Sequence, residues 1–106
     1  MTIEEIGPEA VTERIGGDDK FDLLDVRDGD AYADGHLPGA EHVTIEALEE
    51  TVAEREWAEV VIVYCYVGET SIQAARLIEK YGDADRVISM AGGYEAWESP
   101  TAVEAN

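Results

Sequence analysis

Short apolar runs alternate along this chain with stretches whose apolar residues recur at helical spacing. A continuous β-branched run from Val60 to Val63 is typical of a strand that is buried on both faces. In the following stretch, Ile72, Ala75 and Ile78 fall on one face of a helix. The same reasoning predicts strands near 2–6, 21–26, 41–43, 60–63 and 86–90, and helices near 8–15, 45–55, 71–80 and 92–97.

This order of elements predicts one α/β domain. Strands that alternate with helices form a mainly parallel central sheet, here of about five strands, with helices on both faces. Thr44 is placed to cap the helix that begins at Ile45, and the Asp- and Gly-rich segment 28–35 is expected to be a loop or a single helical turn. We assign residues 1–99 to the domain and residues 100–106 to a flexible polar tail.

The single cysteine, Cys65, lies at the turn between the strand near 60–63 and the helix near 71–80. The first N–H groups of a helix have no partner within the helix and carry the positive end of its dipole, so they stabilise a thiolate or an anionic ligand. This position favours a reactive nucleophile. The alternative is that Cys65 is only a small buried apolar side chain.

A second strand end carries polar residues that bear on the interpretation of Cys65. Asp25 and Arg27 follow the apolar run that begins at Phe21, and ligands of open parallel sheets bind beyond the carboxyl ends of the strands. We interpret Asp25 and Arg27 as a partly buried structural ion pair rather than an acid–base pair. His36 is a candidate base for a Cys–His dyad.

The charge balance excludes two classes of partner. Acidic residues outnumber basic ones by 25 to 7, which gives a formal net charge of -18 and a field that repels nucleic acid and anionic membranes. Self-repulsion of this size predicts a salt-adapted protein, because the Debye length falls to roughly 3 Å at about 1 M salt. Without a leader peptide or a long apolar segment, the chain is expected to be cytoplasmic, as a monomer or weak dimer.

One cysteine also limits the chemistry that the chain can support. It excludes an internal disulfide and a metal cage built from several cysteines, and it leaves no resolving thiol. We expect no metal and no other cofactor.

Three segments, in this order, resemble the motifs of the single-domain rhodaneses, a family of sulfurtransferases. The leading motif is similar to Leu23–Arg27 followed by Gly35–Ala40, the active-site loop to Val63–Ser71, and the closing motif to Gly92–Trp97. The resemblance covers about residues 3–97 and implies a rhodanese-like three-layer fold. A subset of thiosulfate sulfurtransferases with a Cys-Tyr-x-Gly loop resembles the chain more closely than other members do.

The resemblance implies that the Cys65 thiolate takes the outer sulfur from a small anionic donor such as thiosulfate and becomes a persulfide. The sulfur then passes to a thiol, to cyanide or to a sulfur-accepting protein. Converging backbone N–H groups of the loop would hold the donor and the persulfide. The residues that the resemblance assigns to substrate binding are Tyr66, Val67, Gly68, Glu69, Thr70 and Ser71. The resemblance also implies that His36 is a structural histidine near a turn, rather than a base.

Two positions depart from the pattern of many relatives. The residue before the final loop serine is often arginine but here is Thr70, next to the acidic Glu69, and Ala31 stands where many relatives have glutamate. Thr70 and Ser71 are therefore candidates both for hydroxyl donors to the substrate and for caps of the following helix. Gly68 is expected to serve the loop backbone.

Three alternatives remain open at this level. A non-catalytic binding or regulatory module would keep the fold without the activity, and a persulfide relay would take sulfur from a protein donor. A cysteine phosphatase or arsenate reductase is disfavoured, because its loop needs an arginine at the position of Ser71.

Overall fold

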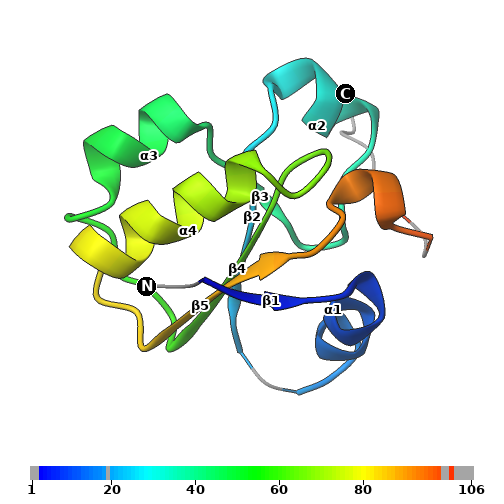
Figure 1. Cartoon of the computed structure of the whole chain (residues 1–106), viewed down its shortest axis with the longest axis horizontal. Helices are drawn as coiled ribbons and strands as arrows, with labels where there is room; N and C mark the ends of the chain where they lie inside the picture. The colour runs from blue at the N-terminus through cyan, green and yellow to red at the C-terminus, as the bar shows by residue number, and fades with distance from the viewer. Residues whose placement is uncertain (1–2, 19, 99–100, 102–106) are drawn as a thin grey trace.

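The computed structural model describes residues 3–18, 20–98 and 101, which form one open sheet with helices packed around it (Figure 1). Its elements are β1 (Glu4–Ile6), α1 (Pro8–Ile15), β2 (Asp22–Asp25), α2 (Gly29–Asp34), β3 (Glu41–His42), α3 (Ile45–Thr51), β4 (Val60–Tyr64), α4 (Thr70–Tyr81), β5 (Arg86–Met90) and a 3₁₀ turn, η1 (Tyr94–Ala96).

All five strands are parallel, in the order β1-β5-β4-β2-β3. The central strand β4 pairs with β2 through Leu24 and Val63, and with β5 through Ile62 and Ile88. The predicted parallel sheet of about five strands is confirmed. Its central strand is the continuous apolar run, as expected for a strand covered on both faces.

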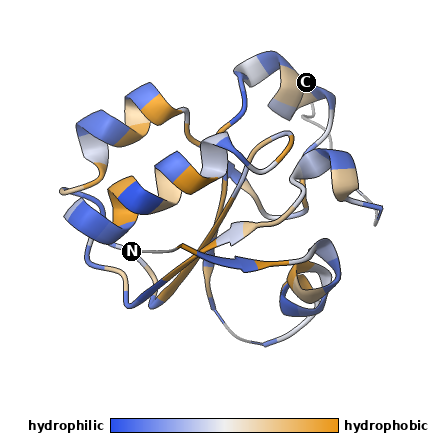
Figure 2. Cartoon of the chain, in the orientation of Figure 1, coloured by the Kyte–Doolittle hydropathy of each residue, from blue (hydrophilic) through white to orange (hydrophobic). Residues whose placement is uncertain are grey.

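Alternate residues of β4 serve two separate apolar clusters. Val61 and Val63 lie in one cluster with side chains of α3 and α4, whereas Ile62 and Tyr64 lie in the other with Val11 of α1. The helices therefore cover opposite faces of the sheet (Figure 1), and apolar residues concentrate on the strands between them (Figure 2). This arrangement confirms the three-layer architecture.

The helix predicted for 45–55 is shorter in the structure, because α3 ends at Thr51. The indole N–H of Trp57 donates to the Val52 carbonyl at 3.0 Å, which is an acceptor that a continuing helix would use. The chain then turns, and Arg55 pairs with Glu41 and lies over the Trp57 ring. Trp57 therefore lies in the chain that follows α3. Thr44 caps α3 as predicted, since its hydroxyl accepts the Ala47 N–H.

Two other segments differ from the prediction in length or type. The segment 28–35 contains a six-residue helix, α2, rather than a single turn, because Asp28 caps it by accepting the Ala31 N–H at 2.9 Å. The predicted last helix is wrong: η1 is a three-residue 3₁₀ turn, and Trp97 behind it is already extended. The boundary predicted at 99/100 and the tail 100–106 lie outside the described residues, apart from Thr101.

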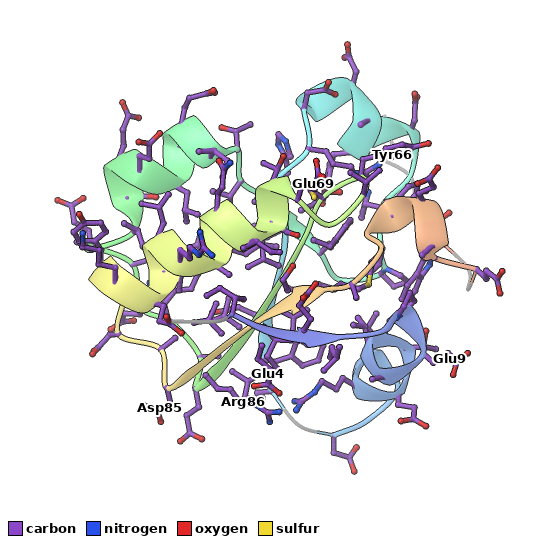
Figure 3. All side chains as sticks on the ribbon, viewed as in Figure 1. Glu4, Glu9, Tyr66, Glu69, Asp85 and Arg86 are labelled. Atoms are coloured by element: carbon purple, nitrogen blue, oxygen red, sulfur yellow. The ribbon has the colours of Figure 1, made fainter. Side chains whose placement is uncertain are left out.

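Within the described part of the chain, no helix is both long enough and apolar enough to cross a membrane. Charged side chains radiate from the surface, and Glu4 and Arg86 form an ion pair at the edge of the sheet (Figure 3).

Candidate active site

The backbone of the loop after β4 folds around the sulfur of Cys65. The backbone N–H groups of Gly68 and Ser71 donate to Sγ at 3.1 Å and 3.3 Å. Cys65 is only 4% exposed, so these donors act where little water competes with them. The loop is a nest of N–H groups aimed at one atom, which is an arrangement suited to negative charge.

A hydroxyl group adds a third contact to the sulfur. Ser71 Oγ lies 3.5 Å from Sγ and 2.7 Å from Ser89 Oγ on β5, and both serines are fully buried. The capping alternative for Thr70 and Ser71 is wrong. The N-cap position of α4 is Glu69, which makes no side-chain capping bond, and Thr70 and Ser71 are the first helical residues. The Ser71 hydroxyl is committed to the sulfur and to Ser89 instead.

These contacts change the acidity of the thiol. Burial, the largest single influence, opposes ionisation of Cys65. Hydrogen bonds from the Ser71 hydroxyl and from the N–H groups of Ser71, Gly68 and Val67 together outweigh burial and lower the pKa of Cys65 below its ordinary value. A larger thiolate fraction at neutral pH follows, which favours the nucleophilic interpretation of Cys65 over the apolar one.

The segment 92–96 supports the loop from behind. The N–H groups of Tyr94 and Glu95 donate to the carbonyl oxygens of Cys65 and Tyr66, at 2.8 Å and 2.9 Å. Gly93 has a φ of 62°, and a Cβ there would lie 2.5 Å from both of those oxygens. The sequence indicated a tight turn at this glycine, but its contact with the loop emerges only when β5 and β4 lie side by side.

Gly68 has a similar backbone role inside the loop. Its φ is 95°, and a Cβ would approach the Gly92 nitrogen to 3.1 Å. Both the left-handed conformation and the close approach favour glycine, which agrees with the expected backbone role.

A cavity of about 330 Å³ opens beside the sulfur. Its lining residues are Val26, Arg27, Asp28, Ala31, Cys65, Tyr66 and Thr70. A cavity of about 450 Å³ beside the start of α1 is larger, but its lining contains no cysteine or histidine. We place the site at the smaller cavity because Cys65 lines it.

The predicted binding residues fall into three groups. Gly68 and Ser71 touch the sulfur, whereas the side chains of Tyr66 and Thr70 line the cavity. The side chains of Val67 and Glu69 are exposed. Figure 3 shows Tyr66 and Glu69 on the loop between β4 and α4. Ala31, the unusual position of the leading motif, also lines the cavity, so its small side chain leaves the space open.

Asp25 and Arg27 form the expected ion pair. Arg27 Nε and Nη2 donate to the fully buried Asp25 carboxylate, with an Nη2–Oδ2 distance of 2.6 Å, and Nη2 also donates to the Gly35 carbonyl. The guanidinium lies 4.0 Å from the centre of the Tyr94 ring. Burial opposes the charge on Arg27, but the Asp25 carboxylate outweighs it and raises the pKa of Arg27. This pair fixes the end of β2 beside the cavity.

Tyr64, at the end of β4, completes this buried network. Its hydroxyl donates to Asp25 Oδ2 at 2.6 Å and accepts the Leu37 N–H at 3.0 Å. Burial and the Asp25 carboxylate both raise the pKa of Tyr64. Sequence reasoning missed the role of Tyr64, because an aromatic residue at a strand end is ordinarily interpreted as core.

The histidines do not contact the sulfur. His36 Nδ1 is hydrogen-bonded to the Tyr32 carbonyl at 2.8 Å, and its ring stacks on the Tyr32 ring with the centroids 3.8 Å apart. His42 Nε2 is bonded to the Arg27 carbonyl at 2.7 Å. In the described chain no histidine hydrogen-bonds to Cys65, so the geometry favours the structural interpretation of His36. The described residues also contain no group of three or more His, Cys, Asp and Glu side chains that could hold a metal ion.

Comparison with known proteins agrees with this geometry. A model of the rhodanese-like domain matches residues 7–100. The chain is 38% identical over 97 residues to a thiosulfate sulfurtransferase GlpE of Actinobacillus pleuropneumoniae, covering 92% of this chain and 88% of the relative. It is 30% identical to a putative sulfur carrier protein YrkF of Bacillus subtilis over 94% of this chain, and it spans about half of that protein, 54%.

Solved structures show the same fold. A rhodanese-like domain protein of Staphylococcus aureus superposes with a TM-score of 0.85 at 17% identity, covering 97% of this chain and all of that one, 100%. The rhodanese-like domain of an Anabaena protein gives a TM-score of 0.82 at 30% identity, over 97% of this chain and 81% of the other. Because the domain model and the relatives span nearly the whole chain, this protein belongs to the rhodanese-like family.

Proposed function

We propose that this protein is a sulfurtransferase that moves a sulfane sulfur from thiosulfate or a persulfide donor to a nucleophilic acceptor through a Cys65 persulfide. The observation that supports it best is the Cys65 sulfur itself, which receives two backbone N–H groups and lies next to a buried hydroxyl. The name of the 38% identical relative, a thiosulfate sulfurtransferase, supports the donor.

In the first half-reaction the Cys65 thiolate attacks the outer sulfur of thiosulfate. A new bond forms between Sγ and that sulfur, the sulfur–sulfur bond of the donor breaks, and sulfite leaves with the bonding electron pair. The negative charge now rests on the outer sulfur of the persulfide. The N–H groups that met the thiolate lie close to this charge, and they need no reorganisation as it develops.

In the second half-reaction a nucleophile attacks the outer sulfur of the persulfide. Cyanide would leave as thiocyanate and a thiol as a persulfide, and the electron pair of the broken bond returns to Sγ as the Cys65 thiolate. Cys65 is the single cysteine of the chain, so the acceptor must come from outside it.

The loop binds its donor without a cation of its own. Thr70 lines the cavity in place of an arginine, and the exposed Glu69 carries a negative charge. Arg27 also lines the cavity, but the bonded Asp25 carboxylate offsets its charge. Backbone N–H groups and the hydroxyls of Thr70 and Ser71 therefore carry most of the recognition of an anionic donor.

Intact mass spectrometry after incubation with thiosulfate tests the proposal. We expect a gain in mass of one sulfur atom, which cyanide or a thiol reverses and which Cys65→Ser abolishes. The same measurement with a small-molecule persulfide as donor separates thiosulfate use from a relay role, in which only the persulfide loads Cys65.

A non-catalytic binding module is the second candidate, and the exposed apolar side chains of Tyr66 and Val67 at the mouth of the site favour it. It predicts no mass gain with any sulfane donor. A phosphatase activity is disfavoured, because the side chain of Ser71, where an arginine is needed, is fully buried and bonded to Ser89.

A further inference from the structure

Two buried hydroxyls link the sulfur of Cys65 to the central sheet. Ser71 Oγ lies 3.5 Å from Sγ, and Ser89 Oγ lies 2.7 Å from Ser71 Oγ. Both serines are fully buried. Ser89 comes from β5, far from the loop in sequence, and no motif pointed to it.

The protons of this pair have a preferred direction. Among the residues that the structure describes, the Ser89 hydroxyl has one hydrogen-bond partner, Ser71 Oγ. If Ser71 donated to Ser89, the Ser89 proton would have no acceptor in this buried position, which is unfavourable. If Ser89 donates to Ser71, the Ser71 proton is free to point at the sulfur once the thiol, which in its neutral form donates to Ser71 Oγ, has ionised. Both hydroxyl protons then have an acceptor, and the Ser71 proton points at Cys65 Sγ, which carries the negative charge of the thiolate.

We propose that Ser89 is a positioning residue for Cys65: by donating to Ser71 Oγ, it directs the Ser71 proton toward the sulfur. Among the described residues, Ser89 makes no hydrogen bond to Cys65, so it acts through Ser71. A hydroxyl that accepts one hydrogen bond also becomes a better donor, which strengthens the contact with the thiolate. The part of this inference that concerns sulfur transfer rests on the proposed function, but the effect on the thiol does not.

A change at Ser89 does not alter the other charged groups near the sulfur, which also influence the pKa of Cys65. Arg27 and Asp28 line the cavity from the end of β2, and Tyr66 lines it from the loop. Glu69 is exposed to solvent on the loop, and Arg76 is exposed further along α4. None of these residues is bonded to Ser71 or Ser89 in the described chain, so changing Ser89 leaves their charges in place.

The test is the pH dependence of Cys65 alkylation by iodoacetamide, in the full-length protein. Ser89→Ala is expected to raise the thiol pKa by half a unit to one unit, and to slow alkylation about threefold to tenfold well below that pKa. Ser71→Ala is expected to have a larger effect. In the Ser71→Ala background, Ser89→Ala should not change the pKa of Cys65 further, because the Ser71 hydroxyl through which Ser89 acts is absent.

Two variants separate this role from a structural one. Ser89→Thr keeps the hydroxyl and should retain most of the native pKa. Val87→Ala, on the same strand, removes buried volume and should lower the thermal midpoint without moving the pKa. An unchanged pKa in Ser89→Ala overturns the inference, and so does an equal shift with and without Ser71.

Sulfur loading provides the second readout. At neutral pH, Ser89→Ala should load sulfur from thiosulfate more slowly than the native protein, and the difference should vanish at a pH above both thiol pKa values. If the native protein forms no persulfide but the alkylation profile shifts as expected, the proposed function fails while the positioning role stands. If loading occurs and the profile does not shift, the positioning role alone fails.

Discussion

Gly93 and Cys65 lie in direct backbone contact, although they are far apart in sequence. A Cβ on Gly93 would stand 2.5 Å from the Cys65 carbonyl oxygen, well inside van der Waals distance. The neighbouring Tyr94 N–H donates to that same oxygen at 2.8 Å. The turn after β5 therefore sets the position of the nucleophile, and the loop cannot move without disturbing the turn.

Gly93→Ala is expected to displace the loop. The methyl group collides with the carbonyl oxygens of Cys65 and Tyr66. Both are backbone atoms, which cannot move aside as the end of a flexible side chain can. We expect the rate of sulfur loading to fall by about a hundredfold, the effect of a displacement of about 1 Å in an active site. Loading is measured by intact mass spectrometry at timed intervals.

Gly39→Ala is the matched control for Gly93. Gly39 has a φ of 83°, also in the left-handed region, but nothing lies within 4 Å of its Cβ position. Both variants place a side chain on a backbone with positive φ, which costs on the order of 1–3 kcal/mol, and only Gly93→Ala carries the collision. Equal loading rates in the two variants would show that the contact with the loop has no functional weight.

Asp25→Ala is expected to cost about 3–5 kcal/mol of unfolding free energy, because it leaves the Arg27 charge without its buried partner. Glu41→Ala removes the partner of Arg55 at the surface and should cost no more than about 1 kcal/mol. Urea denaturation of both variants measures the difference. Similar losses in the two variants would contradict the structural role assigned to the buried pair.

The hydrogen bonds from Ser71, Gly68 and Val67 outweigh burial and lower the pKa of the Cys65 thiol below its ordinary value. Between the native pKa and that of the unfolded chain, the native state binds fewer protons. The free energy of unfolding should therefore rise with pH across this window, and the gain is lost as the pH falls through the native pKa. Urea denaturation across this pH range measures the dependence of the unfolding free energy on pH. In Cys65→Ser the unfolding free energy should not rise in this way.

Thr70→Arg is expected to change donor preference without abolishing sulfur loading. A guanidinium in the cavity should favour the thiosulfate dianion over an uncharged donor by about fivefold, equivalent to about 1 kcal/mol. Gln73→Arg adds the same charge at an exposed site on α4 outside the cavity lining and controls for net charge. Complete loss of loading in Thr70→Arg would instead show that the loop conformation depends on Thr70.

Salt is expected to stabilise the protein. With 25 acidic and 7 basic residues, repulsion outweighs the exposed ion pairs Glu4–Arg86 and Glu41–Arg55, which salt weakens. The thermal midpoint measured by circular dichroism should rise between about 0.05 M and about 1 M potassium chloride. An unchanged midpoint after dialysis into dilute buffer would overturn the proposed salt adaptation.

The main fold could be predicted from sequence because its signals are local. The continuous apolar run at Val60–Val63 indicated a central strand, and the helical spacing after it indicated α4. The last helix was wrong because the N–H groups of Tyr94 and Glu95 bind carbonyl oxygens of the distant loop, and the segment becomes extended at Trp97. The end of α3 was misplaced because a side-chain contact, the Trp57 indole N–H on the Val52 carbonyl, takes an acceptor that a longer helix would use, and helical spacing does not reveal such a contact.

The candidate nucleophile could likewise be predicted, since a lone cysteine between a strand and a helix stands out in the sequence. What surrounds it could not. The contacts of Ser89 with Ser71, of Tyr64 with Asp25 and of Gly93 with the loop join segments that are distant in sequence. These segments meet only in the folded sheet. The sequence by itself determined the order of the elements, the nucleophile and the charge, because these depend on residue type and local spacing. Only the tertiary structure decided that Ser89 bonds to Ser71, that Tyr64 bonds to Asp25 and that the turn at Gly93 supports the loop. A hydrogen bond needs its partners within about 3 Å, and only the pairing of distant strands brings these residues that close together.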